Sequence, residues 1–252
     1  MTNHSFTKPH VYNLSRMTLK DMSQCGAALR RLGTGSLSME ETASRTVRFL
    51  YDSLVGGETG EHACVLVRCF KTHPLGELDA RLQQLAGGSL GAEPASPAMQ
   101  CLTLLGTAGD LPEWNSRRAS AGQQVIPLPS ALGVARIPMI AQLIKQLGLE
   151  VSSVLRPDPK VVIDLQQKSF NVFYVPEALG SPYIPAQQGF VIPYGVRSVL
   201  GFGGVLPRGD LFAVIMFVRV PLPPRTAELF KPLALSAKLA ILPVANGPLF
   251  DA

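Results

Sequence analysis

The chain has 252 residues, of which 46% are hydrophobic and only 16% are charged. Its 23 Lys and Arg outnumber its 18 Asp and Glu, which gives a formal net charge of +5. This length supports one large domain or two small ones with their own hydrophobic cores, and the composition excludes a disordered polyelectrolyte or a collagen-like chain.

The N-terminal part is predicted to be a loosely ordered tail followed by a helix. Residues 1–13 are polar and form the tail. Apolar residues then recur at intervals of three and four: Met22, Cys25, Leu29 and Leu32. This spacing forms one apolar edge and predicts a helix from about 15 to 32. The edge can serve as the seam of a dimer, or it can fold back onto the chain's own core.

A second helix is predicted from a capping pattern. Ser38 is followed three residues later by Glu41, and such a pair satisfies the first free amides of a helix. The residues of its apolar face are Ala43, Val47, Leu50, Tyr51 and Leu54. The helix is expected to close at Gly56.

Two apolar segments, residues 63–70 and 99–105, are predicted to be strands that pair as antiparallel neighbours. The Gly-, Pro- and Ser-containing stretch between them predicts a surface excursion with a short helix near 78–85. A long insertion, residues 107–169, follows. It contains an extended VIPLP segment and one strong helix whose apolar residues are Ile137, Ile140, Ile144, Leu147 and Val151.

The C-terminal part predicts a further strand at 170–175, a Pro-rich loop, and a β-hairpin. The hairpin strands are residues 196–206 and 211–220, joined by a Pro/Gly turn. A closing helix is predicted from Pro224 to about Ala240, with Pro232 kinking it or delaying its start.

Residues 189–240 resemble the C-terminal part of a GAF domain. They contain a Gly-Val-Arg-Ser approach at 195–198, a strand, a short turn, an apolar strand, and a helix opened by proline. The resemblance extends over 38–241 and implies an α+β fold with a central antiparallel sheet. Terminal helices are expected on one face of that sheet and the helical insertion on the other.

Two features depart from a minimal GAF domain. The insertion at 107–169 is longer than the fold needs, and one hairpin strand carries Gly201, Gly203 and Gly204. Glycine in a strand interior indicates a bulge, or the close approach of another backbone or a ligand. The expected organisation is a tail at 1–13, a helical region at 14–36 that can dimerise, one domain at 38–241, and a C-terminal tail at 242–252.

The resemblance implies a cytoplasmic sensory or regulatory module that binds a small molecule of unknown identity and is not an enzyme. The ligand is expected between the sheet and the segments that cover it. Trp114, Arg117 and Arg118 of the insertion offer an aromatic wall and an anion clamp. The candidates from the strand and loop side are Phe173, Tyr183, Tyr194 and Arg197. We expect a homodimer that signals through its terminal helices to a partner protein, and the sequence names no cofactor.

Two alternatives stand beside this interpretation. The first follows from GAF-fold proteins that are thiol-dependent reductases of free methionine sulfoxide. In a regular strand, Cys64 and Cys69 point to opposite faces and do not pair, whereas Cys101 on the partner strand can approach one of them. Arg68 or Lys71 would then supply the positive neighbour that a reactive thiol needs. The second alternative is a scaffold domain without a ligand.

Several classes of site are not expected. The longest uninterrupted apolar run, Leu211–Val218, is too short to cross a bilayer, and the N-terminus carries no secretion signal. The four cysteines, which are Cys25, Cys64, Cys69 and Cys101, have no CxxC spacing and are expected to be reduced. No ligand spacing for a metal is present among His4, His10, His62 and His73. Because Lys and Arg are scattered, nucleic-acid binding is not expected.

Overall fold

The computed structural model describes residues 10–57, 60–91, 93–120, 123–157 and 171–251. Most of the predicted tail at 1–13, the end of the insertion at 107–169 and the first residue of the strand predicted at 170–175 lie outside these ranges.

A six-stranded antiparallel sheet in the order β6-β5-β4-β9-β8-β7 forms the centre of the fold. The predicted antiparallel pair is β4 with β5, and the predicted hairpin is β8 with β9. The six strands are β4 (Cys64–Pro74), β5 (Gln100–Gly109), β6 (Val125–Leu128), β7 (Phe173–Val175), β8 (Ser198–Val205) and β9 (Leu211–Val218). A second, small sheet consists of β1 (Tyr12–Asn13), β2 (Leu54–Gly56) and β3 (Glu61–His62).

Helices cover both faces of the large sheet. The longer ones are α1 (Leu19–Arg31), α2 (Met39–Ser53), α3 (Ala80–Ser89), α5 (Pro138–Gln146) and α9 (Lys231–Ile241). Three helices of five residues are α4 (Ala131–Ala135), α6 (Val151–Leu155) and α8 (Pro224–Glu228). Shorter turns are η1 (Leu14–Arg16), η2 (Leu75–Glu77), η3 (Pro112–Asn115), the π-helix η4 (Gln187–Val191) and η5 (Leu242–Val244).

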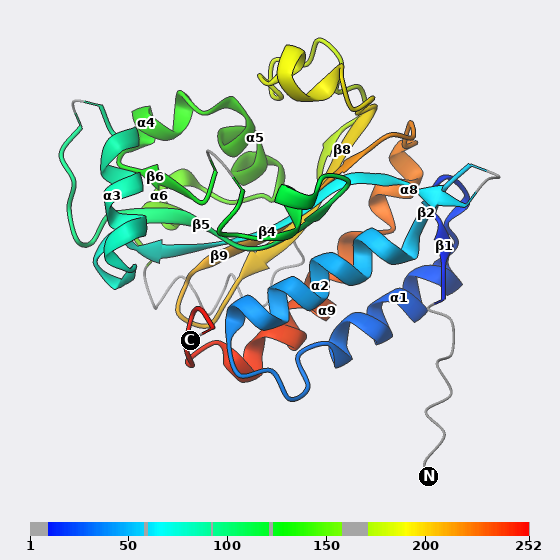
Figure 1. The fold of residues 1–252 in the computed structure, drawn as a ribbon, viewed down its shortest axis with the longest axis horizontal. Helices are drawn as coiled ribbons and strands as arrows, with labels where there is room; N and C mark the ends of the chain where they lie inside the picture. The colour runs from blue at the N-terminus through cyan, green and yellow to red at the C-terminus, as the bar shows by residue number, and fades with distance from the viewer. Residues whose placement is uncertain (1–9, 58–59, 92, 121–122, 158–170, 252) are drawn as a thin grey trace.

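The helices form two layers (Figure 1). Helices α1, α2 and α9 lie together on one face of the sheet, whereas α4 and α5 lie on the other. The predicted fold class, α+β with a central antiparallel sheet between terminal helices and a helical insertion, is confirmed. This architecture is consistent with a GAF-like fold.

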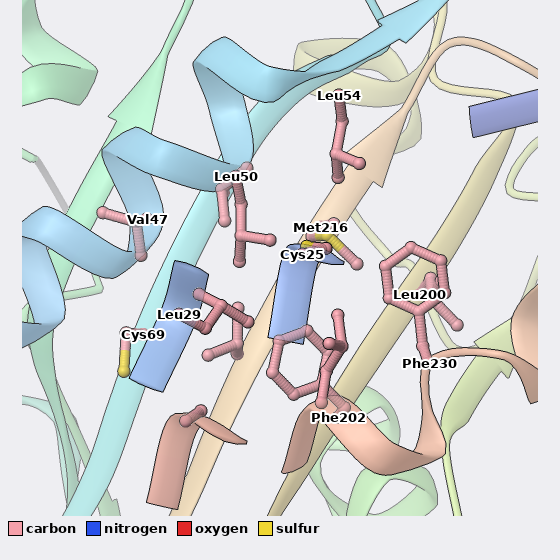
Figure 2. Packing of buried hydrophobic residues seen from close by; sticks show 14 of the residues in the cluster. Cys25, Leu29, Val47, Leu50, Leu54, Cys69, Leu200, Phe202, Met216 and Phe230 are labelled. Carbon is pink, nitrogen blue, oxygen red and sulfur yellow. The ribbon is translucent and has the colours of Figure 1, made fainter. Parts of the chain in front are cut away.

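The core under α1, α2 and α9 is densely filled, and Figure 2 shows its central part. Cys25 and Leu29 of α1 meet Leu50 of α2 above the sheet, where Phe202 of β8 packs near Phe230. Full burial of one such Leu or Phe side chain stabilises the fold by about 1.5–3 kcal/mol. The apolar edge of the first predicted helix is therefore used inside the chain, because Met22, Cys25 and Leu29 are all buried in it.

Local side-chain hydrogen bonds fix the positions at which α1 and α2 begin. Thr18 and Asp21 form a capping box at the start of α1, which the sequence analysis did not identify. At α2 the predicted Ser38 cap is present, since its Oγ accepts a 2.9 Å bond from the amide of Glu41. The Glu41 carboxylate accepts from the amide of Leu37, so this second pair is only half of the predicted box.

A glycine turn and a proline divide two helices that were predicted as continuous. The single strong helix predicted from Ile137 to Val151 is instead α5 followed by the short α6, separated by a turn in which Gly148 has a positive φ of 78°. The closing helix is divided into α8 and α9, and Pro232 stands in the first turn of α9. Pro232 therefore delays the start of a helix, as predicted, because proline is accepted only in the first turn.

The glycines of β8 serve the close approach of another backbone. A Cβ on Gly203 would lie 2.2 Å from the carbonyl oxygen of Phe212 on β9. The pairing of β8 with β9 runs in continuous register, so this approach is not a bulge. A similar approach occurs at Gly106 of β5, where a Cβ would lie 2.7 Å from the carbonyl carbon of Ala43 on α2.

Replacing Gly106 by alanine is expected to push α2 away from the sheet, because the new methyl group meets fixed backbone atoms. We expect Gly106→Ala to lower the free energy of unfolding by about 1–3 kcal/mol, measured by urea denaturation. The matched control is Gly87→Ala in α3, where a Cβ meets no atom within 4 Å and the change should stabilise the helix by about 0.5–1 kcal/mol. A Gly106→Ala protein as stable as the parent would contradict the close packing.

Candidate functional site

A cleft of about 400 Å³ lies on the face of the sheet opposite α1, α2 and α9. Its floor consists of residues from β4 and β9: Leu66, Arg68, Phe70, Ile215 and Phe217. Its sides are formed by Trp114, Gln123, Ile126, the start of α5 and the segment from Ile184 to Phe190. The volume is that of a typical small-molecule site, and most of the lining is apolar.

Strand alternation explains which β4 side chains reach the cleft. Leu66 and Phe70 belong to the hydrophobic cluster on the cleft side, whereas Val67 and Cys69 belong to the cluster under the helices. Arg68 stands between Leu66 and Phe70 in this period of two and lines the cleft with them. A charged residue is thereby placed at the centre of an apolar floor.

Arg68 is almost fully buried, with 7% of its surface exposed. Its Nη1 donates a 2.8 Å hydrogen bond to Oε1 of Gln123. Its Nε is buried without a hydrogen-bond partner among the described residues. Burial lowers the pKa of the guanidinium to about 10, which still leaves it charged at neutral pH.

Trp114 forms an aromatic wall of the cleft. The turn that carries it is fixed by Asn115, whose side chain accepts from the Gly109 amide at 3.1 Å and donates to the Gly109 carbonyl at 2.9 Å. The ring centroid of Trp114 lies 5.6 Å from that of Phe190 and 4.7 Å from that of Tyr194, both in edge-on arrangements. Three aromatic side chains from two distant segments thus meet at one side of the cleft.

The cover of the cleft consists of irregular elements. The first turn of α5, from Ile137 to Ile140, lines the cleft, and the N-cap residue Ile137 provides no side-chain hydrogen bond. The π-helix η4 contributes Gly189 and Phe190. π-Helices are rare and occur frequently at functional sites.

The predicted aromatic residues fall around this cleft at different depths. Trp114 lines it, and Tyr194 packs against Trp114 from behind. Phe173 is fully buried in the hydrophobic cluster of the same face and is not among the lining residues. Tyr183 is 37% exposed and precedes the lining residue Ile184. Their role in ligand binding stays a prediction.

The predicted arginines lie elsewhere. Arg117 is buried and forms a two-pronged ion pair with Glu40 of α2, at 3.0 and 3.1 Å. Its guanidinium also lies 3.8 Å from the ring centre of Phe250, so its charge and its planar face are already engaged. Arg118 is exposed, and Arg197 lines a different hollow beside Glu177. The anion clamp expected at Arg117 and Arg118 is not part of the cleft lining.

Arg68 and Gln123 are the polar groups that the sequence analysis did not assign to ligand binding. From the sequence, Arg68 was expected only as a positive neighbour of a reactive thiol. The available signal was a single charge inside the apolar segment ACVLVRCF, residues 63–70. Alternation in β4 places Arg68 on the face opposite Cys69, so the two side chains serve different layers.

The four cysteines are free and buried. Cys64 and Cys69 both belong to the cluster under the helices, contrary to the opposite faces expected from a regular pleat, because the pairing of β4 with β9 shifts between Cys64 and Leu66. Burial raises the pKa of Cys25, Cys64 and Cys69 to about 12 and that of Cys101 to about 11. Thiols with such pKa values stay protonated at neutral pH.

Within the described ranges, no group of three or more His, Cys, Asp and Glu side chains could hold a metal ion. None of the helices in the part of the chain that the structure describes is long and apolar enough to span a membrane.

Comparison with known proteins gives structural similarity at a distance but no similarity in sequence. No family model matches the chain, and no curated protein matches it in sequence. Among solved structures, the chain is similar to the free methionine-R-sulfoxide reductase from Neisseria meningitidis in complex with its substrate. The identity is 11% and the TM-score is 0.46, and the alignment covers 92% of this chain and 97% of that chain.

The thiols are expected to be unreactive in the native protein, because all four are buried and protonated. Iodoacetamide labelling at pH 7.5 (about one unit below an ordinary thiol pKa) should modify none of the cysteines without denaturant and all of them in guanidinium chloride. Mass spectrometry of the intact protein counts the added groups. Rapid labelling of Cys64, Cys69 or Cys101 in the native state would contradict the burial and favour the thiol-dependent alternative.

Proposed function

We propose that this chain is a regulatory module that binds a small molecule in the cleft between the sheet and its irregular cover. The observation that carries the proposal is an apolar cleft of about 400 Å³ that contains a buried arginine and an aromatic wall. A ligand pocket typically combines apolar walls with a small number of placed polar groups.

The arrangement of the cover supports regulation as well as binding. The loop that follows β5 carries Trp114 in the cleft and, three residues later, Arg117 in its ion pair with Glu40 at the start of α2. The same region of α2 receives the C-terminal segment, since the amides of Met39 and Glu40 donate to the carbonyls of Pro248 and Leu249. A ligand that displaces Trp114 would therefore act on α2 and on the C-terminal segment through one loop.

In this proposal the ligand favours one arrangement of the loop, and the equilibrium shifts by the difference in its affinity for the two arrangements. The output then passes to a second copy or a partner protein. The exposed Leu235 and Leu239 of α9, one turn apart, supply an apolar contact surface for either.

Binding should be visible in the fluorescence of Trp114, which is the only tryptophan of the chain. We expect a member of a panel of small aromatic acids, amides and alcohols to change the emission and to raise the melting temperature. A ligand at a hundredfold excess over its Kd stabilises the native state by about 2.7 kcal/mol. Phe190→Ala should weaken binding about threefold to tenfold, because it removes an aromatic contact of the cleft. The control is Leu179→Ala, an exposed residue outside the cleft, and equal effects of both changes would count against the cleft.

The connection from the cleft to the C-terminal segment should depend on Arg117. With the tightest ligand of that panel, hydrogen exchange measured by mass spectrometry should change at 110–120 and at 246–251 in the parent protein. In Arg117→Gln the change at 110–120 should persist and the change at 246–251 should be lost, because the ion pair with Glu40 is broken. Arg118→Gln, an exposed neighbour, is the control. An unchanged response at 246–251 in Arg117→Gln would refute this route.

The thiol-dependent reductase of free methionine sulfoxide requires a thiolate that the substrate can reach. The buried cysteines supply none in this conformation, as their exposure and raised pKa values indicate. The labelling experiment above separates this alternative from ligand binding, and a panel without any binding compound would leave the scaffold alternative.

A further inference from the structure

We propose that Arg68 is a receptor for a carboxylate, so that the ligand of the cleft is a small organic acid with an apolar or aromatic body. This inference rests on the proposed function and adds the chemical class of the ligand. It is carried by a buried positive charge that the described residues leave without a counter-charge.

Among three buried cations, Arg68 is the one that has no carboxylate partner among the described residues. Lys71 is 3% exposed and lies 2.7 Å from Oδ2 of Asp210, and Arg117 is 6% exposed and lies 3.0 Å from Oε1 of Glu40. Arg68 is 7% exposed, yet its hydrogen-bond partner among the described residues is a neutral amide, that of Gln123. Burying an unpaired charge costs several kcal/mol, and buried charges are therefore normally paired. The fold pairs two of these cations and leaves the third facing a cleft.

The described lining of the cleft supplies no counter-charge to Arg68. Among the described residues that line the cleft, Arg68 is the one charged side chain, and Gln123 is its neutral neighbour. Burial lowers the pKa of Arg68, and among the described residues no carboxylate forms an ion pair with it that would raise the pKa. An anionic group of a ligand would thus be the first counter-charge that this guanidinium meets.

The donors that remain on Arg68 suit a carboxylate. Nη1 already donates to Gln123, whereas Nε is shielded from solvent and has no acceptor among the described residues. A guanidinium donates two parallel N–H bonds to the two oxygens of a carboxylate, which would satisfy two of the donors that remain. A single monovalent cation balances a carboxylate fully but balances a phosphate dianion only in part, so the carboxylate is favoured.

The first turn of α5 adds to the positive potential of the cleft. The N-terminus of a helix favours a negative charge, and Ile137 provides no side-chain cap for α5. Pro138 has no amide hydrogen and the Ile140 amide donates to the Ile137 carbonyl at 3.0 Å, so Met139 supplies the one amide of this turn that has no acceptor among the described residues. Residues 137–140 line the same cleft as Arg68. The aromatic side, Trp114 and Phe190, would then contact the body of the acid.

The test compares phenylacetate with the uncharged phenylacetamide, with acetate, and with phenyl phosphate, by isothermal titration and Trp114 fluorescence. We expect phenylacetate to bind about 10- to 100-fold more tightly than phenylacetamide in the parent protein, which is the range of a charge-assisted hydrogen bond. In Arg68→Met this ratio should fall to about one. In Arg118→Met, an exposed arginine outside the cleft, the ratio should be kept.

The melting temperature of the ligand-free protein distinguishes an arginine that serves as a ligand receptor from one that serves only the fold. Arg68→Met removes an unpaired buried charge and keeps an unbranched side chain, so its melting temperature should equal or exceed that of the parent protein. A strongly lowered melting temperature together with an unchanged phenylacetate ratio would overturn the assignment, because Arg68 would then serve the fold alone.

The remaining outcomes distinguish the carboxylate receptor from the wider proposal that the cleft binds a small molecule. Equal binding of phenylacetate and phenylacetamide, both sensitive to Phe190→Ala, would refute the carboxylate receptor and retain the cleft as a binding site. Tighter binding of phenyl phosphate than of phenylacetate would replace the carboxylate by a phosphate. If no probe binds to the parent protein at millimolar concentration, the carboxylate receptor is refuted, and the wider compound panel then decides separately whether the cleft binds any ligand.

Discussion

The burial of the central strands on both faces is the constraint on which this structure depends. Every residue of β9 and nearly every residue of β4 is buried, so each side chain must suit the layer that it faces. Alternation along the strands divides these side chains between the three-helix layer and the cleft side. The two layers differ in construction: α1, α2 and α9 have 11–15 residues and fill their face, whereas α4, α6 and η4 have 5 residues each and α5 has 9. The cleft results from this difference, since short elements leave space above the sheet.

Most of the fold could be predicted because its signals are local. The strands appear as apolar runs, the hairpin as a Pro/Gly turn between two of them, and the delayed start of the last helix as Pro232. The three short strands of the second sheet were not predicted, as two or three residues carry no periodicity. The shift in β4 after Cys64 was also missed, because a bulge is set by the pairing with β9 and not by the residues of one strand.

The site was less accessible to sequence reasoning, since partners distant in the sequence decide what each polar group does. Arg117 looked free for an anion in the sequence, but its partner Glu40 lies in α2 and Phe250 lies near the C-terminus. Arg68 looked like a neighbour of cysteines, but strand alternation turns it to the other face. Trp114 was identified because it is a lone large aromatic residue in an insertion, which is a local signal.

The loop after β5 connects the cleft with the helical layer by a path that does not pass through the sheet. A close-packed sheet resists small displacements, because its side chains fill both faces at high density. The loop instead holds Trp114 with the cleft cluster and, through Arg117, contacts Glu40 and Phe250 beside the helical layer. The same loop meets α2 at two further points, because Asp110 accepts a 2.7 Å hydrogen bond from the Tyr51 hydroxyl and Asn115 accepts a hydrogen bond from Arg48. In the proposed regulation, a ligand that moves this loop would therefore act on α2 at several points and, through Arg117, beside the C-terminal segment.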